Sequence, residues 1–443
     1  DLTPGREIWH PKAAWGGGGR GVSLRGRMAK QFQALPGTFD VLAPESARYG
    51  ALVGRFARHV EAAGYGLVVS PLIEEVDLFR RVGESTDVVR KEMYDFEDKG
   101  GRHIALRPEG TAQVMRAYLQ HHPQPPFKAW YAGPNFRYER QQAGRFRQHH
   151  QVGLEAIGTA DPDIDVEVIA LQHDFYKELG LIQVTLKLNS LGDATCRPAY
   201  RQLLLDYLTE HQDELCDEHK ATIADNPLRV LDCKREPCIK ATEHAPFQVD
   251  HLCAECKQHL DRVTQGLDAL GIAYERAPRL VRGLDYYTRT TFEFAADALE
   301  SAQNAIGGGG RYDGLGEALG GAPTPGIGFG SGIERILLAC DAEGVFATDE
   351  VANAPDVFVI DTVGGSAARD LTAELRRAGI AADRAFDGRS FKAQMKQALR
   401  SNARLAVVVE DNGIELRTLT EKGEPEALDR ATIVDHLRKR LDQ

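Results

Sequence analysis

Residues 136–157 read FRYERQQAGRFRQHHQVGLEAI and combine two chemical patterns. The first is a concentration of four arginines within the eleven positions 137–147, interleaved with aromatic residues and a glycine. A guanidinium group can hold phosphate oxygens with two parallel donors, so this density indicates an anion-binding loop. A solvated basic loop between two strands is the alternative.

The second pattern, at residues 151–157, alternates strictly and is typical of a β-strand. One face carries Gln151, Gly153 and Glu155, and the other carries residues for the core, namely Val152, Leu154 and Ala156. A small ligand lying over the glycine would be held at both ends, by an amide and by a carboxylate. The alternative is an edge strand with one solvated face.

The composition of the 443 residues is that of an ordinary globular protein of about three domains, with 42% hydrophobic and 27% charged residues. No apolar run approaches the roughly 18 residues of a membrane span, so a membrane protein is excluded, as are a collagen-like fibre and a disordered chain. The net charge of -11 means that nucleic-acid binding would need a local basic patch. Seven cysteines, an odd number, do not resemble a secreted disulfide framework, and they favour a reducing, cytoplasmic setting.

The chain divides into segments of different character. Residues 1–27 contain four consecutive glycines and no apolar run, so we interpret them as a disordered leader. Apolar residues at helical spacing predict a helix over 45–63, which ends at Gly64, followed by a strand over 65–70 that Pro71 closes. We also expect a helix over 196–215, a polar stretch with five cysteines over 216–262, and strands around 282–294. A strand at 357–360, a helix at 366–378 and a strand at 405–409 predict a separate α/β unit.

Four further motifs carry chemistry. Glu109 and Thr111 flank Gly110 in a Pro-Glu-Gly-Thr turn, where the alternative is that Thr111 is a helix N-cap. Residues 282–290 join Arg282 to the paired Tyr286 and Tyr287, although paired tyrosines are more often core residues. The motif at 307–313 begins with four glycines, which allow close backbone approach to a ligand unless they form a flexible loop. Residues 325–335 place alternate glycines along a short strand, which suits a flat ring, and put Arg335 in the first turn of the next helix.

Taken together and in this order, the motifs resemble those of class II aminoacyl-tRNA synthetases, and specifically the histidyl-tRNA synthetase family. The segment 45–71 looks like motif 1, 136–147 like motif 2 and 325–335 like motif 3, whereas 106–111 and 282–289 look like the two histidine-specific signatures. The resemblance implies an α+β fold, with a class II antiparallel-sheet catalytic domain (28–190 and 269–350), a small mainly helical insertion (191–268) and a C-terminal α/β anticodon-binding domain (355–443). It also implies a cytoplasmic homodimer that contacts through motif 1 and does not enter a membrane.

The resemblance further implies that ATP activates L-histidine, with Mg²⁺ bridging the phosphates, and that the histidyl group passes to the 3′ end of histidine tRNA. The site residues follow by position. They are Arg137 and Arg282 as the catalytic pair; Glu109, Gly110, Thr111, Gln151, Glu155, Tyr286 and Tyr287 for histidine; and Arg137, Arg145 and Arg335 for ATP. For tRNA they are Gln142 in motif 2 and the basic residues Lys392, Lys396 and Arg400, which with Arg404 are spaced by four and would form one helical stripe. A solvated helix face is the alternative for that stripe.

The cysteine pairs Cys233/Cys238 and Cys253/Cys256, with His251 and His259 nearby, have roughly zinc-ribbon spacing. Structural zinc and reduced thiols in a small helical insertion both remain open, because the family does not require zinc.

Two other functions compete with the ligase. A synthetase-like, non-catalytic regulatory subunit of ATP phosphoribosyltransferase usually lacks the C-terminal domain and loses its catalytic signatures, whereas Arg137, Arg282 and Arg335 are all present here. An adenylating ligase that does not use tRNA would leave the basic C-terminal stripe unexplained.

Overall fold

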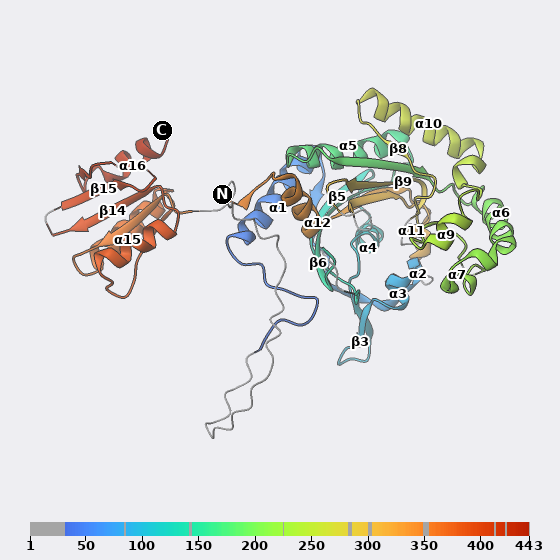
Figure 1. Cartoon of the computed structure of the whole chain (residues 1–443), viewed down its shortest axis with the longest axis horizontal. Coiled ribbons are helices and arrows are strands. Elements are labelled where there is room, and N and C mark those ends of the chain that lie inside the picture. Colours follow the sequence, from blue (N-terminus) through green and yellow to red (C-terminus); the bar gives the residue numbers. More distant parts are fainter. Residues whose placement is uncertain are drawn as a thin grey trace, which may run out of the picture.

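The structure, a computed structural model, contains two folded bodies, and the description covers the following residues. They are 32–83, 86–140, 144–224, 226–281, 286–299, 304–348, 354–411, 413–420 and 423–442. The predicted leader at 1–27 and the predicted site residues Arg282 and Gln142 lie outside them. Figure 1 gives the arrangement of the elements.

An eight-stranded, mainly antiparallel sheet forms the centre of the larger body (Figure 1). Its strands in spatial order are β1 (Gly66–Leu67), β5 (Phe127–Phe136), β6 (Gln148–Ile157), β11 (Gly326–Gly332), β10 (Ala305–Arg311), β9 (Thr288–Ala296), β7 (Val184–Ser190) and β8 (Glu275–Arg276). A second, three-stranded sheet has the order β2 (Ile73–Glu75), β4 (His103–Leu106) and β3 (Tyr94–Glu97). This is the predicted α+β class, with the strand over 151–157 confirmed as part of β6.

One face of the large sheet packs against long helices to form the main core. The helices are α1 (Glu45–Glu61), α5 (Pro162–Glu178), α12 (Ile333–Glu343) and α10 (Ala254–Ala269). In α1 the residues Leu52, Phe56 and Val60 repeat every fourth position and are fully buried, which is the amphipathic pattern that predicted this helix. The apolar residues of β6 enter the same core, as their alternation requires.

The opposite face of the sheet holds a second, smaller core that contains tyrosines. Its helices are α2 (Val76–Gly83), α3 (Asp87–Arg90), α4 (Thr111–His121) and α11 (Leu315–Ala318). Polar residues of β6 point to this side, so the candidate site lies between the sheet and α4.

The strand predicted over 65–70 is shorter than expected, since β1 spans only Gly66–Leu67. It lies at the edge of the sheet and pairs, in parallel, with β5 alone. The ladder ends at Leu67, although the backbone N–H of Val68 still donates to the Trp130 carbonyl at 2.8 Å. The helix before β1 ends as predicted, with Gly64 at a φ of 86°.

Short helices fill the chain between β7 and β8, ahead of α10. They are α6 (Arg197–Glu210), α7 (Asp217–Lys220), α8 (Leu228–Leu231) and α9 (Glu236–Ala241), with 3₁₀ turns at Gln212–Glu214 and Gln248–His251. Residues 196–215 were predicted as a single helix, whereas α6 ends at Glu210 and a 3₁₀ turn follows. A core of their own, which includes Tyr200, Leu204 and Leu208, packs these helices together.

The C-terminal body is an α/β unit around a five-stranded sheet. Its strands in spatial order are β13 (Ala382–Arg384), β12 (Val357–Asp361), β14 (Leu405–Glu410), β15 (Gly413–Thr418) and β16 (Glu426–Leu428). The helices are α14 (Ser366–Arg377), α15 (Phe391–Arg400) and α16 (Ile433–Leu441). The two buried strands and the first helix lie where the sequence predicted them.

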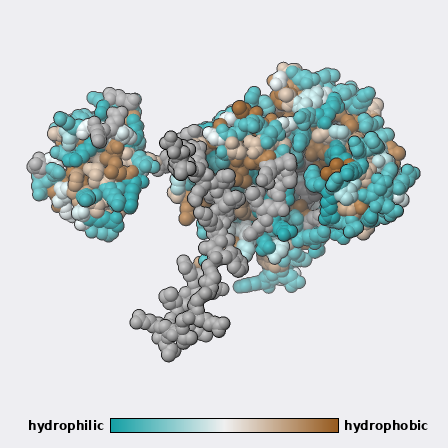
Figure 2. All heavy atoms as spheres, viewed as in Figure 1, coloured by the Kyte–Doolittle hydropathy of each residue, from teal (hydrophilic) through white to brown (hydrophobic). Residues whose placement is uncertain are grey.

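The visible surface of both bodies is largely hydrophilic, with scattered apolar residues (Figure 2). Among the helices of the described residues, none has the length and apolar character that crossing a membrane requires.

Candidate active site

The pairing of β6 with β11 creates a sheet face that is nearly free of side chains. Glu155 lies opposite Gly328, Gly153 opposite Gly330, and Gln151 opposite Gly332. A Cβ atom at position 328 would lie 1.8 Å from Glu155 Oε2, so only glycine fits there. The surface made by Gly153, Gly328, Gly330 and Gly332, hereafter the glycine face, therefore separates an amide from a carboxylate, as the alternation predicted.

Glu155 is fully buried and accepts hydrogen bonds from three hydroxyl groups. The Tyr312 hydroxyl donates to Oε2 at 2.6 Å, while those of Thr111 and Tyr131 donate to Oε1 at 2.8 and 3.3 Å. Burial raises the pKa of the Glu155 carboxyl to about 8, against the lowering effect of the hydroxyl donors. Such a group can pair with a ligand nitrogen inside a pocket that excludes water.

Two of these donors, Tyr131 and Tyr312, were missed by the sequence analysis. Tyr131 lies directly opposite Gly153 on β5, and a Cβ at Gly110 or Gly153 would lie within 2.4–2.5 Å of its ring or hydroxyl. In the sequence it sits within an apolar run and looks like a core residue. Tyr312 lies two residues after the glycine run, in the same motif, and that position was the available signal.

The Glu109–Thr111 turn begins α4, with Gly110 at the N-cap position. The Glu109 carboxylate accepts hydrogen bonds from the backbone N–H groups of Thr111 (2.5 Å) and Ala112 (2.9 Å). The alternative that Thr111 caps this helix is therefore wrong, since the carboxylate performs that task and frees the Thr111 hydroxyl for Glu155. Burial raises the pKa of Glu109, against these backbone hydrogen bonds and the nearby charge of Arg137.

Tyr286 and Tyr287 are both buried on the same side of the sheet. Their rings lie 4.7 Å apart, and Tyr286 meets the Tyr312 ring edge-on at 6.0 Å. A Cβ at Gly310 would approach the Tyr287 ring to 2.9 Å, so the glycine run in β10 gives that ring its space. At the other end of the glycine face, Gln151 accepts a hydrogen bond from Asn135 at 2.7 Å.

The glycine run at 307–310 is part of β10, so the alternative of a flexible loop is wrong. Arg311, which closes that motif, is fully buried and pairs with Asp165 of α5 and, at 3.1 Å, with Asp313. Asp165 also receives hydrogen bonds from Thr290 and His259, at 2.6 and 2.7 Å. This network joins α5 and α10 to the sheet and is structural.

A cationic cluster, Arg137, Arg145 and Arg335, comes from motif 2 and the start of α12. Arg137 donates Nε–H to the Pro108 carbonyl at 2.8 Å, which fixes it against the Glu109 turn. Glu139 lies 3.8 Å from Arg137 and 3.7 Å from Arg145. Burial and the charge of Arg145 both lower the pKa of the Arg335 guanidinium.

The pKa of His149 is also affected by the positive charge of this cluster. Burial, followed by the charge of Arg137, lowers the pKa of its imidazole to about 3, and Arg335 contributes in the same direction. Like charges held together in this way are stabilised when an anion binds between them. The cluster is therefore suited to a polyanion such as a nucleotide triphosphate.

The basic stripe of the C-terminal body lies on α15, where Lys392, Lys396 and Arg400 are exposed. Arg404 is not on this helix, because α15 ends at Arg400 and Asn402 adopts a φ of 54°. Its guanidinium instead donates to the Leu441 carbonyl at 3.1 Å. Phe386 and Phe391 are exposed nearby in the chain, at 56% and 37%.

The four cysteines with roughly zinc-ribbon spacing fall into two separate groups. Cys233 and Cys238 lie with Cys216 and His219, whereas Cys253 and Cys256 lie with Asp193 and Cys196. Neither of the two histidines first considered joins them, since His259 pairs with Asp165 and His251 stacks on Tyr200 at 6.1 Å. A single ribbon made of both pairs, which the sequence left open as one alternative, is therefore wrong, because η2 (Gln248–His251) and the start of α10 carry the second pair to a different place.

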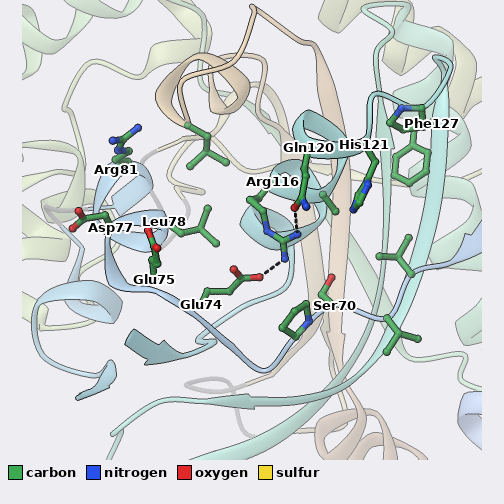
Figure 3. Close-up of a pocket in the computed structure, with 16 residues that line it drawn as sticks. Ser70, Glu74, Glu75, Asp77, Leu78, Arg81, Arg116, Gln120, His121 and Phe127 are labelled. Carbon is green, nitrogen blue, oxygen red and sulfur yellow. Dashed lines mark hydrogen bonds and ion pairs between the residues drawn. The ribbon is translucent and has the colours of Figure 1, made fainter. Parts of the chain in front are cut away.

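A pocket of about 840 Å³ lies elsewhere, beside β1 and β2 (Figure 3). Its lining includes Ser70, Pro71 and Glu74, together with Arg116 of α4, which donates hydrogen bonds to Glu74 and Gln120 (Figure 3). None of the hydroxyl groups bonded to Glu155 belongs to its lining residues. This pocket thus adjoins the edge of the sheet rather than the glycine face.

Comparison with known proteins places this geometry in a family. The family model described as "Histidyl-tRNA synthetase" matches residues 37–336. The chain belongs to the histidyl-tRNA synthetase family. A histidine–tRNA ligase of Halothermothrix orenii is 46% identical over 418 residues, which cover 92% of this chain and 99% of that protein. One of Rhodococcus erythropolis is 48% identical over 420 residues, which cover 92% and 98%.

Solved structures agree with this membership. The apo histidyl-tRNA synthetase of Staphylococcus aureus has a TM-score of 0.78 and 35% identity, with 92% of this chain and all of that chain covered. A Bacillus halodurans structure titled as an ATP phosphoribosyltransferase regulatory subunit/histidyl-tRNA synthetase shares the fold, at a TM-score of 0.59 and 18% identity. The high identity to curated ligases supports the ligase function over the regulatory alternative.

Proposed function

We propose that this chain activates L-histidine with ATP to histidyl-adenylate and then transfers the histidyl group to the 3′ end of histidine tRNA. The observation that carries the proposal is a buried carboxylate, Glu155, at one end of the glycine face, joined through one turn to Arg137 of the cationic cluster. Arg137 bonds the Pro108 carbonyl, and Thr111, three residues later, bonds Glu155. An amino acid and a nucleotide would meet across that turn.

The proposed histidine-binding site, at the glycine face, has polar groups at both ends. Glu155 and Tyr287 would bind the imidazole, with Tyr286 behind Tyr287, while Glu109, Thr111 and Gln151 would hold the α-amino group next to Gly110. A pocket that pairs with both ring nitrogens rejects isosteres, because its own buried groups would stay unpaired. Tyr312 and Tyr131 would orient the Glu155 carboxylate through their hydroxyl groups.

The nucleotide side must stabilise two anions as they meet. The histidine carboxylate attacks the α-phosphorus, the bond to the bridging oxygen breaks, and pyrophosphate leaves with that electron pair. Arg137, together with Arg282, would neutralise the charge on the α-phosphate oxygens, and Arg145 and Arg335 would hold the outer phosphates. No nucleophilic side chain is needed.

Mg²⁺ would supply charge neutralisation between the phosphates. Glu139, whose carboxylate lies 3.8 Å from Arg137 and 3.7 Å from Arg145, would be a neighbour of that ion, because oxygen atoms are the donors that Mg²⁺ prefers.

Transfer RNA would contact the protein at two places. Gln142 in motif 2 would read the extra 5′ nucleotide of histidine tRNA, and Lys392, Lys396 and Arg400 on α15 would hold the anticodon arm through its phosphates. The exposed rings of Phe386 and Phe391 offer stacking surfaces for unpaired bases beside that helix.

A cytoplasmic homodimer completes the proposal. The edge strand β1 and the residues after it expose Leu67, Val69, Leu72 and Ile73, at 54%, 85%, 41% and 47%. Together with the adjoining pocket they offer an apolar surface for a second copy at motif 1. We propose the catalytic domain at 28–190 and 269–350, the insertion at 191–268 and the anticodon-binding domain at 355–443.

Pyrophosphate exchange measured with each of the twenty amino acids tests this function. Histidine alone should support ATP–pyrophosphate exchange. An absence of exchange with any amino acid would favour the regulatory alternative, and exchange with another amino acid would overturn the assignment of the pocket.

The substitution Glu155→Ala tests the histidine site. It should raise KM for histidine by about 10- to 100-fold with a much smaller effect on KM for ATP, because a charge-assisted hydrogen bond contributes about 1.5–3 kcal/mol. Equal effects on the two KM values would contradict the role given to Glu155.

A further inference from the structure

Cys216, His219, Cys233 and Cys238, hereafter cluster A, gather where three short helices meet. The four potential ligand atoms lie within 4.8 Å of one another. The His219 Nδ1 atom is 3.2 Å from the Cys216 sulfur and 3.7 Å from that of Cys238. Three thiols and one imidazole nitrogen thus face a common centre.

Asp193, Cys196, Cys253 and Cys256, hereafter cluster B, gather at the start of α10. The sulfur atoms of Cys196 and Cys256 are 3.9 Å apart. Asp193 Oδ1 lies 3.7 Å from the Cys196 sulfur and 3.8 Å from that of Cys253. The spacing within this cluster also fits four ligands around one centre.

Both sets have the geometry and chemistry of a closed zinc site. Tetrahedral Zn²⁺ with Zn–S bonds of about 2.3 Å has S···S edges of roughly 3.8 Å, which the Cys196–Cys256 separation of 3.9 Å matches. Thiolate, imidazole and carboxylate are the ligands that zinc takes in proteins, and four protein ligands leave no open position for catalysis. We infer that the helical insertion binds two structural zinc ions, one at cluster A and one at cluster B.

Neighbouring groups support the ligands, as is usual around structural metals. In cluster A, the backbone N–H of Cys216 donates to the Cys238 sulfur at 3.3 Å, and the Arg235 guanidinium donates to the Cys216 sulfur at 3.4 Å. In cluster B, the backbone N–H of Asp193 donates to the Cys196 sulfur at 3.4 Å, while Arg289 donates to Asp193 Oδ2 at 3.2 Å and leaves Oδ1 toward the thiols. Each arginine would offset part of the negative charge of a thiolate-rich site.

The insertion has a physical need for such ions. Helices α7, α8 and α9 have four, four and six residues, which is far below the length at which a helix is stable by itself. A small core usually needs disulfides or a metal, and all seven cysteines are free thiols in the structure. Zinc at cluster A would join the ends of these helices to one another.

Cluster B would have a second effect because of its position. It ties the start of α10 to the turn after β7, and Arg289 of β9 contacts the same Asp193. One residue beyond Cys196, Arg197 donates to the backbone carbonyl of Tyr287 at 2.8 Å. A metal at cluster B would therefore steady one wall of the proposed histidine pocket.

Metal analysis of the full-length protein, produced with zinc in the medium and dialysed, tests the inference. The unsubstituted chain should contain two zinc equivalents. Cys238→Ala and Cys256→Ala should each reduce this to one, and the double variant to none. Replacement by Co²⁺ should give thiolate-to-cobalt absorption that each single substitution reduces by about half.

The controls separate metal binding from loss of a buried thiol. Cys340→Ala, which removes a fully buried thiol in α12 outside both clusters, should leave two equivalents. His219→Ala should leave one equivalent, while His219→Cys should restore two, because cysteine can replace imidazole only as a ligand. The retained ion in each single variant shows that the chain has folded.

Several results would overturn the inference. They are fewer than two equivalents in the unsubstituted chain, loss of the whole metal content on either single substitution, loss of metal in Cys340→Ala, or disulfides in place of the free thiols.

Discussion

Glu155 is a single residue whose position suits ligand binding but lowers the stability of the fold. Its carboxyl is buried completely, and three hydroxyl donors are needed to offset part of the cost of charge in that place. With a pKa of about 8, the group is close enough to the ordinary imidazole value of about 6.5 to exchange a proton with a histidine ring. The residue thus suits a ligand that is itself a titrating ring.

The raised pKa of Glu155 predicts how stability depends on pH. An ordinary glutamate releases its proton near 4.5, whereas the folded chain keeps this proton until about pH 8, so the group lowers the stability of the empty protein as pH rises through that window. Glu155→Gln removes the ionisable group. Relative to the unsubstituted chain, the variant should gain stability between pH 5 and pH 8, by on the order of a few kcal/mol, in urea unfolding.

Glu61→Gln, at an exposed position of α1, is the matched control and should follow the unsubstituted chain at every pH. If the Glu155→Gln curve also ran parallel to it, the buried acid would not carry this pH dependence.

Neighbouring elements bring these residues together, and the sequence predicted some of this arrangement and not the rest. The period of two along 151–157 identified both faces of β6, because burial on one side leaves a signature in every second residue. Tyr131 gave no such signature, since it belongs to an apolar strand, although its ring lies over Gly110 and Gly153 and its hydroxyl bonds Glu155. The full ligand sets of the cysteines were equally hidden, because each pair with roughly zinc-ribbon spacing is joined by two residues from earlier in the chain, Cys216 and His219 in one group and Asp193 and Cys196 in the other.

The exposed basic face of α15 predicts a defect that is confined to tRNA. The double substitution Lys392→Glu and Lys396→Glu should lower kcat/KM for tRNA by about 10- to 100-fold, because two contacts to phosphates are lost. Each lost contact should also reduce the slope of log affinity against log salt concentration by about one. Pyrophosphate exchange without tRNA should be unchanged. Aminoacylation at several salt concentrations measures both effects.

Lys439→Glu with Arg440→Glu makes the same change of charge on α16, where both side chains are exposed. This control should retain normal aminoacylation. An equal loss of aminoacylation in the two double variants would mean that tRNA binding depends on the net charge of the domain and not on the basic face of α15.

At the scale of the whole molecule, the large sheet has an edge that no other strand of the described residues covers. Strand β1 has a neighbour on one side only. The residues after it expose apolar side chains to solvent beside the pocket of Figure 3. Such an edge invites pairing with another chain, and natural proteins usually protect it. A second copy would provide that protection here.

The substitution Val69→Asp tests this edge, because it places a charge where an apolar contact is proposed. We expect the dimer to dissociate, with a dissociation constant raised by about 100-fold, as measured by sedimentation. Ile182→Asp, at a residue that is equally exposed at 85% but lies between α5 and β7, should remain dimeric. A dimer that survived in Val69→Asp would remove β1 from the interface.

The glycine face has a consequence for any attempt to redesign the enzyme. Enlarging a binding cavity normally means trimming a side chain, but Gly328 and Gly153 have none to trim, and the space over them is already filled by the Glu155 carboxylate and the Tyr131 ring. Room for a bulkier amino acid would have to be taken from the tyrosines, and removing either hydroxyl would strip Glu155 of a donor. Broader substrate tolerance would thus come only together with weaker binding of the natural amino acid.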